Sequence, residues 1–426
     1  MENKKYILES IATGKRFEDK GWTLDAENEE KPSLIRAIYN KKQIEVGDLS
    51  EGLYRFEDWL PIHRRLEGSF APITYKSEGF AKELGLSNLY ITFSGYWPER
   101  GIKMKTCSFK ETESYSVSAR LDPNEKKVLV VASAGNTARA FAKVCSDNNI
   151  PLLLCVPKDN LNALWFDAPI NDNVKLIVSE SGGDYFDAIH LSNLASEMEE
   201  YFPEGGAKNV ARRDGMATTT LSAVTHIGKI PEYYFQAVGS GTGAIAAWEA
   251  NLRLIEDGRF GSNKMKLMIS QNSPFTPIHD AWYADSRAIL PMDDDTARKE
   301  VEEITAKVLS NRKPPYPVIG GLYDAMKDAG GEVLLATNEE LEAAGDLFEK
   351  TEGNDIHPAS AVAAATLINA VKNNTIDKDA LIMLNITGGG EKRFKSEHKL
   401  YYLKPVLEFP MNPDKKEVFK KLKNLF

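Results

Sequence analysis

Cysteine is scarce in this chain: Cys107, Cys145 and Cys155 are the three cysteines among 426 residues. An odd and sparse set argues against a disulfide framework and indicates a reducing compartment. Long apolar runs are also lacking, since Val128–Ala132 and Leu152–Val156 fall far below the ~20 residues that span a bilayer. The polar first residues show no secretory signal. We therefore expect a soluble protein of the cytoplasm.

An excess of positive charge is missing as well. The net charge is −9, with 53 Lys and Arg against 62 Asp and Glu, and the pI is about 5.4. This balance excludes a global basic footprint for nucleic acid, so any anion site must be built locally from Arg, Lys and helix N-termini. We expect small-molecule ligands, and neither nucleic acid nor a membrane as partner.

Metal-ligand spacing is absent among the histidines at positions 63, 190, 226, 279 and 398, so no metal site is expected. His357 stands directly before Pro358 and an alanine-rich helical pattern. We expect it to cap that helix or line a pocket, and a catalytic role is the lesser alternative.

What the chain does contain, from about residue 72 onward, is an alternation of short apolar runs with helical patterns. Buried parallel strands joined by crossover helices produce this alternation, and ligands then bind at the carboxyl ends of the strands. Strands are expected at 127–132, 152–156, 174–178, 233–238, 266–270 and 381–386, and helices at 136–147, 184–201, 244–256 and 359–371. Residues 293–309 are expected to form a charged, solvated helix. Residues 415–425 form a basic amphipathic tail, packed on the surface or, less favoured, against a membrane.

The run Ser108-Phe109-Lys110 supplies an amine in an apolar setting. A lysine taken alone is normally a solvated surface residue. Here Phe109 and the apolar segment 89–93 are expected to remove water from the amine, lower its pKa and favour Schiff-base chemistry.

Two polar loops follow expected strands and open expected helices. Ser133-Ala134-Gly135-Asn136-Thr137 offers free backbone N–H groups that suit a carboxylate, although an ordinary helix cap has the same residue types. Gly239-Ser240-Gly241-Thr242-Gly243 lets the backbone approach a phosphate closely. A dinucleotide site would need an acidic residue after the next strand, which instead ends Ile269-Ser270-Gln271. A phosphate cradle is therefore the favoured interpretation.

A third loop, Thr387-Gly388-Gly389-Gly390, follows the last expected strand. The Thr387 hydroxyl could bond to a pyridine nitrogen, although a capping threonine in a glycine turn is the plainer alternative. An amine, a polar helix start, a phosphate cradle and a neutral hydroxyl, all at strand ends, together predict pyridoxal 5′-phosphate as cofactor. A neutral partner for the ring nitrogen favours elimination and replacement over transamination.

These residues resemble the fold type II pyridoxal phosphate enzymes, the tryptophan synthase β-like group. The Ser-Phe-Lys run is similar to that of threonine synthase. The stretches Phe93–Glu99 and Glu204–Arg213 resemble the cysteate synthase family more closely. The resemblance runs from about residue 6 to 405. It implies two open, twisted, mostly parallel sheets flanked by helices, after a small β-rich N-terminal module.

The resemblance also implies roles for individual residues. Lys110 would be the Schiff-base lysine and would move the Cα proton, Asn136 would hold the ring hydroxyl, Gly239 to Gly243 the phosphate, and Thr387 the ring nitrogen. Substrate is expected at Ser108 and at Ser133, Ala134, Gly135 and Thr137, with Lys105, Arg212 and Arg213 as its cationic partners.

The resemblance implies that sulfite replaces the phosphate group at Cβ of O-phospho-L-serine. The reaction passes through an aminoacrylate and gives L-cysteate and phosphate. The alternative is threonine synthase, acting on O-phosphohomoserine with water. A non-catalytic protein of the same fold is disfavoured by the intact Lys110, Asn136 and Thr387. Relatives are commonly dimers, so a homodimer is expected.

The N-terminal module departs from the pattern of its relatives, which often carry a zinc-ribbon-like unit. Ser10, Thr13 and Ala26 stand where cysteines would be expected, and hydroxyls are poor zinc ligands. We expect the module, residues 1–70, to keep its strands without metal and to depend on packing against the main body. The other expected domains are a large cofactor-binding domain (71–125 and 225–405), a small α/β domain (126–224) and a C-terminal tail (406–426).

Overall fold

A computed structural model describes residues 4–426 and contains two parallel sheets, as the alternation of strands and helices predicted. The larger sheet has six strands in the order β15-β14-β13-β16-β5-β4, and all neighbours are parallel except β4 and β5. Its strands are β4 (Ile73–Lys76), β5 (Leu89–Phe93), β13 (Tyr233–Ala237), β14 (Lys266–Asn272), β15 (Glu332–Ala336) and β16 (Ile382–Ile386).

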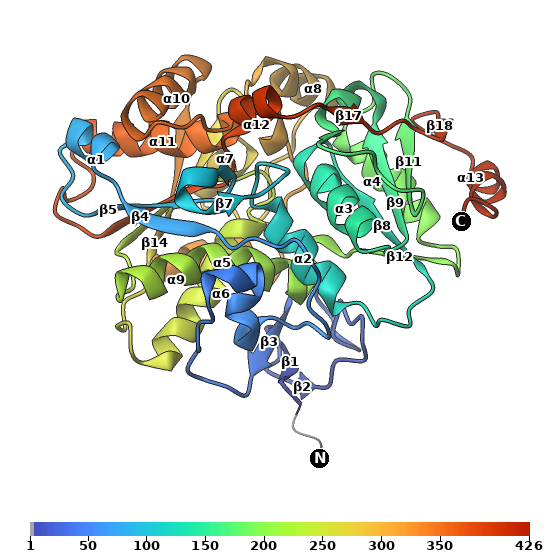
Figure 1. Cartoon of the computed structure of the whole chain (residues 1–426), viewed down its shortest axis with the longest axis horizontal. Helices are drawn as coiled ribbons and strands as arrows, with labels where there is room; N and C mark the ends of the chain where they lie inside the picture. Colours follow the sequence, from blue (N-terminus) through green and yellow to red (C-terminus); the bar gives the residue numbers. More distant parts are fainter. Residues whose placement is uncertain (1–3) are drawn as a thin grey trace.

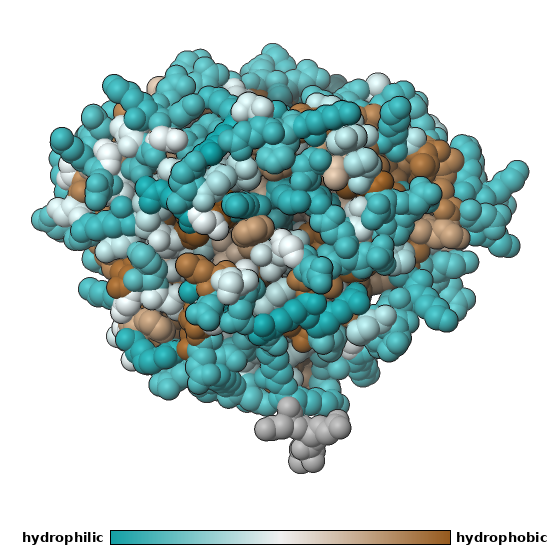
Figure 2. All heavy atoms as spheres, in the orientation of Figure 1, coloured by the Kyte–Doolittle hydropathy of each residue, from teal (hydrophilic) through white to brown (hydrophobic). Residues whose placement is uncertain are grey.

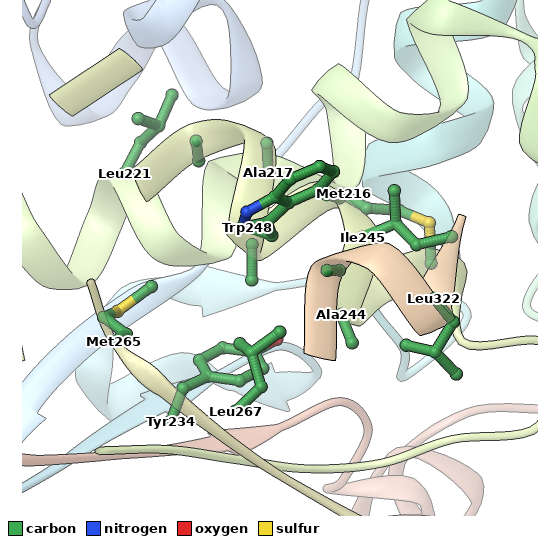
Figure 3. Packing of buried hydrophobic residues seen from close by; sticks show 14 of the residues in the cluster. Met216, Ala217, Leu221, Tyr234, Ala244, Ile245, Trp248, Met265, Leu267 and Leu322 are labelled. Carbon is green, nitrogen blue, oxygen red and sulfur yellow. The ribbon is translucent and has the colours of Figure 1, made fainter. Parts of the chain in front are cut away.

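Helices cover both faces of this sheet, with α10 (Asn338–Glu352) and α11 (Pro358–Lys372) on one side and α5 (Val210–Ile227), α6 (Thr242–Asp257) and α9 (Leu322–Ala329) on the other (Figure 1). Successive strand residues point to opposite faces, so both sides of each strand must be apolar. Tyr234 packs in the core beneath the sheet and Phe235 in the core above it, and both are fully buried. In the lower core, Met216 and Leu221 of α5 lie close to Trp248 of α6 (Figure 3).

The second sheet has five parallel strands in the order β12-β8-β9-β11-β18. They are β8 (Val128–Ala132), β9 (Leu152–Pro157), β11 (Val174–Ser179), β12 (Tyr201–Pro203) and β18 (Leu407–Phe409), with helices α3 (Asn136–Asp147) and α4 (Tyr185–Ala195) packed against them. The last strand, β18, comes from the C-terminal tail. The tail helix α13 (Lys415–Leu422) packs on α4 through the buried Val418 and Leu422, so its apolar face lies against this protein's own core.

The N-terminal module is a three-stranded antiparallel sheet in the order β2-β1-β3, made of β1 (Tyr6–Ser10), β2 (Arg16–Phe17) and β3 (Ile35–Tyr39). The Ser10 hydroxyl donates a hydrogen bond to the carboxylate of Glu29 and accepts one from the backbone N–H of Thr13 at 3.3 Å. Polar contacts therefore join the positions where the resemblance would place cysteines.

Two expected helices end earlier than their patterns suggested. The helix expected at 184–201 ends at Ala195, and the helix expected at 293–309 is α8 (Asp294–Glu303). After α8 the chain turns inward, because the backbone N–H groups of Thr305 and Ala306 donate to the side chains of Asn338 and Asn272 at 2.9 and 3.0 Å. The expectation of a continuous solvated helix to residue 309 was therefore wrong.

The molecular surface is mainly hydrophilic in the view of Figure 2, and the visible apolar side chains gather mostly near the C-terminal strand and helix. Within residues 4–426, no helix combines the length and the apolar character needed to cross a membrane.

Candidate active site

A single cavity lies where the loops after β8, β13 and β16 meet, at the carboxyl ends of strands from both sheets. The structure thus brings three loops that are far apart in sequence to one place. The predicted site residues that line this cavity are Lys110, Ser133, Ala134, Gly135, Asn136, Thr137, Arg212, Gly239, Ser240, Gly241, Thr242, Gly243 and Thr387.

Lys110 is the first residue of helix α2 (Lys110–Arg120). The backbone before it is fixed against the loop after β16, because the N–H of Phe109 donates to the carbonyl of Thr387 at 2.8 Å. Burial lowers the pKa of Lys110 below its usual value, while the carboxylate of Glu113, 3.2 Å from Nζ, counteracts part of this effect. The amine is therefore held in a setting that favours its neutral, nucleophilic form.

Asn136 begins helix α3, and its side-chain oxygen accepts a hydrogen bond from Arg139 at 2.9 Å. Arg139 is itself held, since it lies 4.0 Å over the ring of Trp165 and donates to the backbone carbonyl of Thr106 at 3.0 Å. With its oxygen occupied, the Asn136 amide group can only donate toward the cavity. Such a donor suits an anionic ring oxygen.

The glycine loop lies at the N-terminus of the 16-residue helix α6, where the first backbone N–H groups have no partner within the helix. Side chains would not fit at Gly241 and Gly243. A Cβ on Gly241 would lie 2.5 Å from Leu322 Cδ2, and the φ of Gly241 is +77°; a Cβ on Gly243 would lie 2.5 Å from Gln236 Nε2. The loop is therefore a backbone cradle suited to a phosphate group.

Thr387 follows β16, and its hydroxyl lies 3.3 Å from the hydroxyl of Ser360. Both groups are neutral, and both are buried. A lysine amine, an amide donor, an anion cradle and a neutral hydroxyl around one cavity fit the functional groups of pyridoxal phosphate, which carries an aldehyde, a ring hydroxyl, a phosphate and a ring nitrogen.

Three predicted residues do not line the cavity. The ammonium of Lys105 lies 2.9 Å from the carboxylate of Asp167. Ser108 is almost fully buried, and its backbone pairs with Gly388. Arg213 is fully buried and binds Glu249 at 2.9 Å, on the side of α5 that faces the N-terminal module. Other contacts occupy Lys105 and Arg213, and packing encloses Ser108, so the structure does not bring these three residues to the cavity; their role in substrate binding stays a prediction.

Sequence reasoning missed several residues that line the cavity. Tyr185 and the segment 307–311 had no motif to mark them, although Ile304, Ala306 and Leu309 interrupt the charged pattern in a way that a solvated helix would not. His357 does line the cavity, and its Nε2 lies 2.8 Å from the carboxylate of Glu391. It is the N-cap residue of α11, but its side chain makes no capping hydrogen bond.

Glu111, next to Lys110, gives the site a pH-dependent stability. Burial raises the pKa of Glu111 from its ordinary value of 4.5 to about 7, although the N–H and hydroxyl of Thr106 donate to its carboxylate. Because the folded state binds the proton more tightly, stability is fully present below pH 4.5 and decreases as the pH rises toward 7. We expect the decrease in the free energy of unfolding over this pH range to be about 3 kcal/mol smaller in Glu111→Gln than in the wild type. Chemical denaturation of both proteins over this pH range tests it; equal pH slopes would contradict the assignment.

Comparison with known proteins identifies the family. Residues 75–388 match the family described as "Pyridoxal-phosphate dependent enzyme". The chain is 47% identical over 411 residues to a cysteate synthase of Methanosarcina acetivorans, covering 96% of this chain and 98% of the relative. It is 48% identical over 376 residues to a cysteate synthase of Methanocella paludicola, covering 88% of each.

Solved structures support the fold. Maize serine racemase matches with a TM-score of 0.57 at 14% identity, covering 75% of this chain and 89% of that structure. Serine racemase from Dictyostelium discoideum matches with a TM-score of 0.53 at 16% identity, covering 82% of this chain and 99% of that structure. Full-length identity and the matching fold agree with the cavity chemistry, and this chain belongs to the pyridoxal-phosphate-dependent enzymes and, among them, to the cysteate synthase family.

Proposed function

We propose that this enzyme replaces the phosphate of O-phospho-L-serine with sulfite, giving L-cysteate and inorganic phosphate. The observation that carries the proposal is the single cavity that holds Lys110, Asn136, the glycine loop and Thr387, in a chain whose close relatives are cysteate synthases. Threonine synthase, the alternative from sequence, is not favoured by these relatives.

Pyridoxal phosphate, when bound, supplies an aldehyde that binds amines and a ring that draws electrons from the substrate Cα. Lys110 would hold this group through its amine and, once that amine is free, would take the proton from the substrate Cα. The C–O bond at Cβ breaks and its electron pair leaves with phosphate. The sulfur lone pair of sulfite then forms the C–S bond at Cβ, and Lys110 returns the proton to Cα.

The other cavity residues hold and orient. Asn136 would donate to the ring oxygen, the backbone N–H groups of Gly239–Gly243 would bind the phosphate of the cofactor, and the uncharged Thr387 hydroxyl would contact the ring nitrogen. Ser133–Thr137, at the N-terminus of α3, bind the substrate carboxylate. Neutral Thr387 keeps the ring a weak electron acceptor, which favours replacement over transamination.

The leaving phosphate and the entering sulfite are both anions, and Lys307 is a cavity residue that could meet them. No carboxylate of residues 4–426 lies within 4.0 Å of its ammonium, which donates to the backbone carbonyl of Val301 at 2.8 Å and to that of Glu302. Arg212, by contrast, is bound by two carboxylates. We therefore assign Lys307, rather than Arg212, to the oxyanion at Cβ.

Location, assembly and domain limits are part of the same proposal. The three cysteines are buried and free, which suits a reducing cytoplasm. A homodimer is proposed because fold type II relatives are commonly dimers. The division into 1–70, 71–125 with 225–405, 126–224, and 406–426 stays a prediction; the tail's strand β18 joins the sheet of the small domain.

The reaction can be tested with purified protein loaded with pyridoxal phosphate. O-phosphoserine with sulfite should yield cysteate and phosphate in equal amounts, detected by mass spectrometry and a phosphate assay. The matched control omits sulfite and should yield no cysteate. Threonine formed from O-phosphohomoserine and water, with no cysteate from the first pair, would overturn the proposal.

A further inference from the structure

Glu113 lies one helical turn after Lys110 on α2, outside the residues that line the cavity. Its Oε2 lies 3.2 Å from Lys110 Nζ, and its side chain is fully buried. Within residues 4–426, no other carboxylate lies within 4.0 Å of this amine. A buried carboxylate is costly unless it is paired, so its position beside the reactive amine calls for a physical explanation.

Arg212 fixes Glu113 from the other side. Its Nη1 lies 3.2 Å from Glu113 Oε1, while its Nε and Nη2 bind the carboxylate of Glu204 at 2.8 and 2.6 Å. Glu204 in turn accepts the backbone N–H of Gly206 at 2.9 Å. Two basic and two acidic side chains thus alternate in one row, Lys110, Glu113, Arg212 and Glu204.

Nε, Nη1 and Nη2 of Arg212 each contact a carboxylate in this arrangement. Arg212 is therefore poorly placed to bind an incoming anion, even though it lines the cavity. The bidentate pair of Arg212 with Glu204 has a fixed geometry. The contact of Arg212 with Glu113 is a single ion pair through Nη1.

We infer that Glu113 is a positioning residue that binds the Lys110 amine whenever it is free and stabilises its proton between uptake from the substrate Cα and return to it. This inference rests on the proposed role of Lys110. In the reaction Lys110 must hold a proton inside a buried cavity, and the carboxylate of Glu113 is the adjacent negative charge that makes this possible.

The charged groups around Lys110 shift its pKa in opposite directions. Burial lowers the pKa of Lys110, Glu113 raises it, Arg212 lowers it and Glu204 raises it. The other titratable groups that line the cavity come from α4, the segment after α8 and the start of α11, namely Tyr185, Lys307 and His357. Removing Glu113 or Arg212 should therefore shift the protonation of Lys110 in opposite directions.

The rate of cofactor binding depends on the protonation state of Lys110 and can be measured without catalytic turnover. Bond formation between Lys110 Nζ and the aldehyde carbon releases one water and needs the lone pair of the neutral amine. Cofactor-free, full-length protein is mixed with pyridoxal 5′-phosphate over a pH series at constant ionic strength. The rate at which the visible absorbance band appears is measured, and borohydride reduction followed by mass spectrometry confirms attachment to Lys110.

Glu113→Gln should take up the cofactor roughly tenfold faster than the wild type on the acid side of the wild-type midpoint. Arg212→Gln should move the midpoint the opposite way, to higher pH. Glu113→Asp, which keeps the charge, should stay close to the wild type. Glu111→Gln is the matched control, because Glu111 is buried on the same helix but contacts Thr106 instead of Lys110.

Opposite shifts in the two variants support the inference, since general damage to the site would move both the same way. If Glu113→Gln does not fold, the alkaline shift of Arg212→Gln alone decides. If the variants that fold have the same pH midpoint of cofactor uptake as the wild type, the role of Glu113 is overturned, while the role of Lys110 is unaffected. Equal uptake by Lys110→Ala and wild type, or none by the wild type, would instead overturn the proposed function.

Discussion

Replacing Lys110 with alanine should reduce cysteate formation by roughly 10³-fold or more and abolish the visible absorbance band of the bound cofactor. The residue supplies both the covalent attachment and the base that moves the Cα proton, so a single substitution removes two functions. Steady-state rates of phosphate release and an absorbance spectrum measure the two effects separately.

Lys110→Arg is the informative second variant. Arginine keeps a cation beside Glu113 but cannot form the covalent bond, so we expect the fold to be kept and the activity lost. Lys126→Ala serves as a control, because Lys126 is exposed and far from the cavity-lining residues. Substantial activity and an unchanged spectrum in Lys110→Ala would refute the assignment.

Replacing Arg213 with methionine should destabilise the protein by about 3–5 kcal/mol, because the buried carboxylate of Glu249 would lose its closest cation. Arg213 binds Glu249 at 2.9 Å and also donates to the backbone carbonyl of Ile35 in β3. Arg36 of the same strand lies 3.3 Å from Glu249. This cluster attaches the N-terminal module to helices α5 and α6. The midpoint and slope of urea denaturation provide the measurement.

The double variant Arg213→Met with Glu249→Met is the matched control for this loss. Removing both buried charges leaves Arg36, which is partly exposed to water, as the one group of the cluster without its carboxylate partner, so much of the lost stability should return. Cofactor uptake by folded Arg213→Met should match the wild type, since Arg213 lies outside the cavity lining. A single variant as stable as the wild type would show that the module is held by other contacts.

The α/β class, the two parallel sheets and the cofactor were predictable from sequence, and the structure and comparisons confirm them. The reason is local: a strand buried on both faces must be apolar throughout, as in 152–156, and a loop after it must be polar or small. The helix expected at 136–147 matches α3 at both ends, because Gly135 and the following polar residues mark its start.

Side-chain partners were not predictable in the same way. Arg212 and Arg213 are adjacent in sequence, yet one contacts Glu113 beside Lys110 and the other contacts the N-terminal module. Helical rotation separates neighbours by about 100°, but which direction faces the cavity depends on tertiary packing. The contact of Lys105 with Asp167 could not be predicted either, since the two residues lie 62 positions apart. The site assignments themselves stay predictions until the variants are measured.

The pairing of β18 with β11 has a consequence for synthesis of the chain. Residues 407–409 complete a sheet whose other strands lie between residues 128 and 203, so this edge of β11 lacks its neighbour until residues 407–409 have been synthesised. An unpaired strand edge is a site of aggregation. Residues 407–422 therefore protect this edge late in synthesis, because they supply both the neighbouring strand and a covering helix.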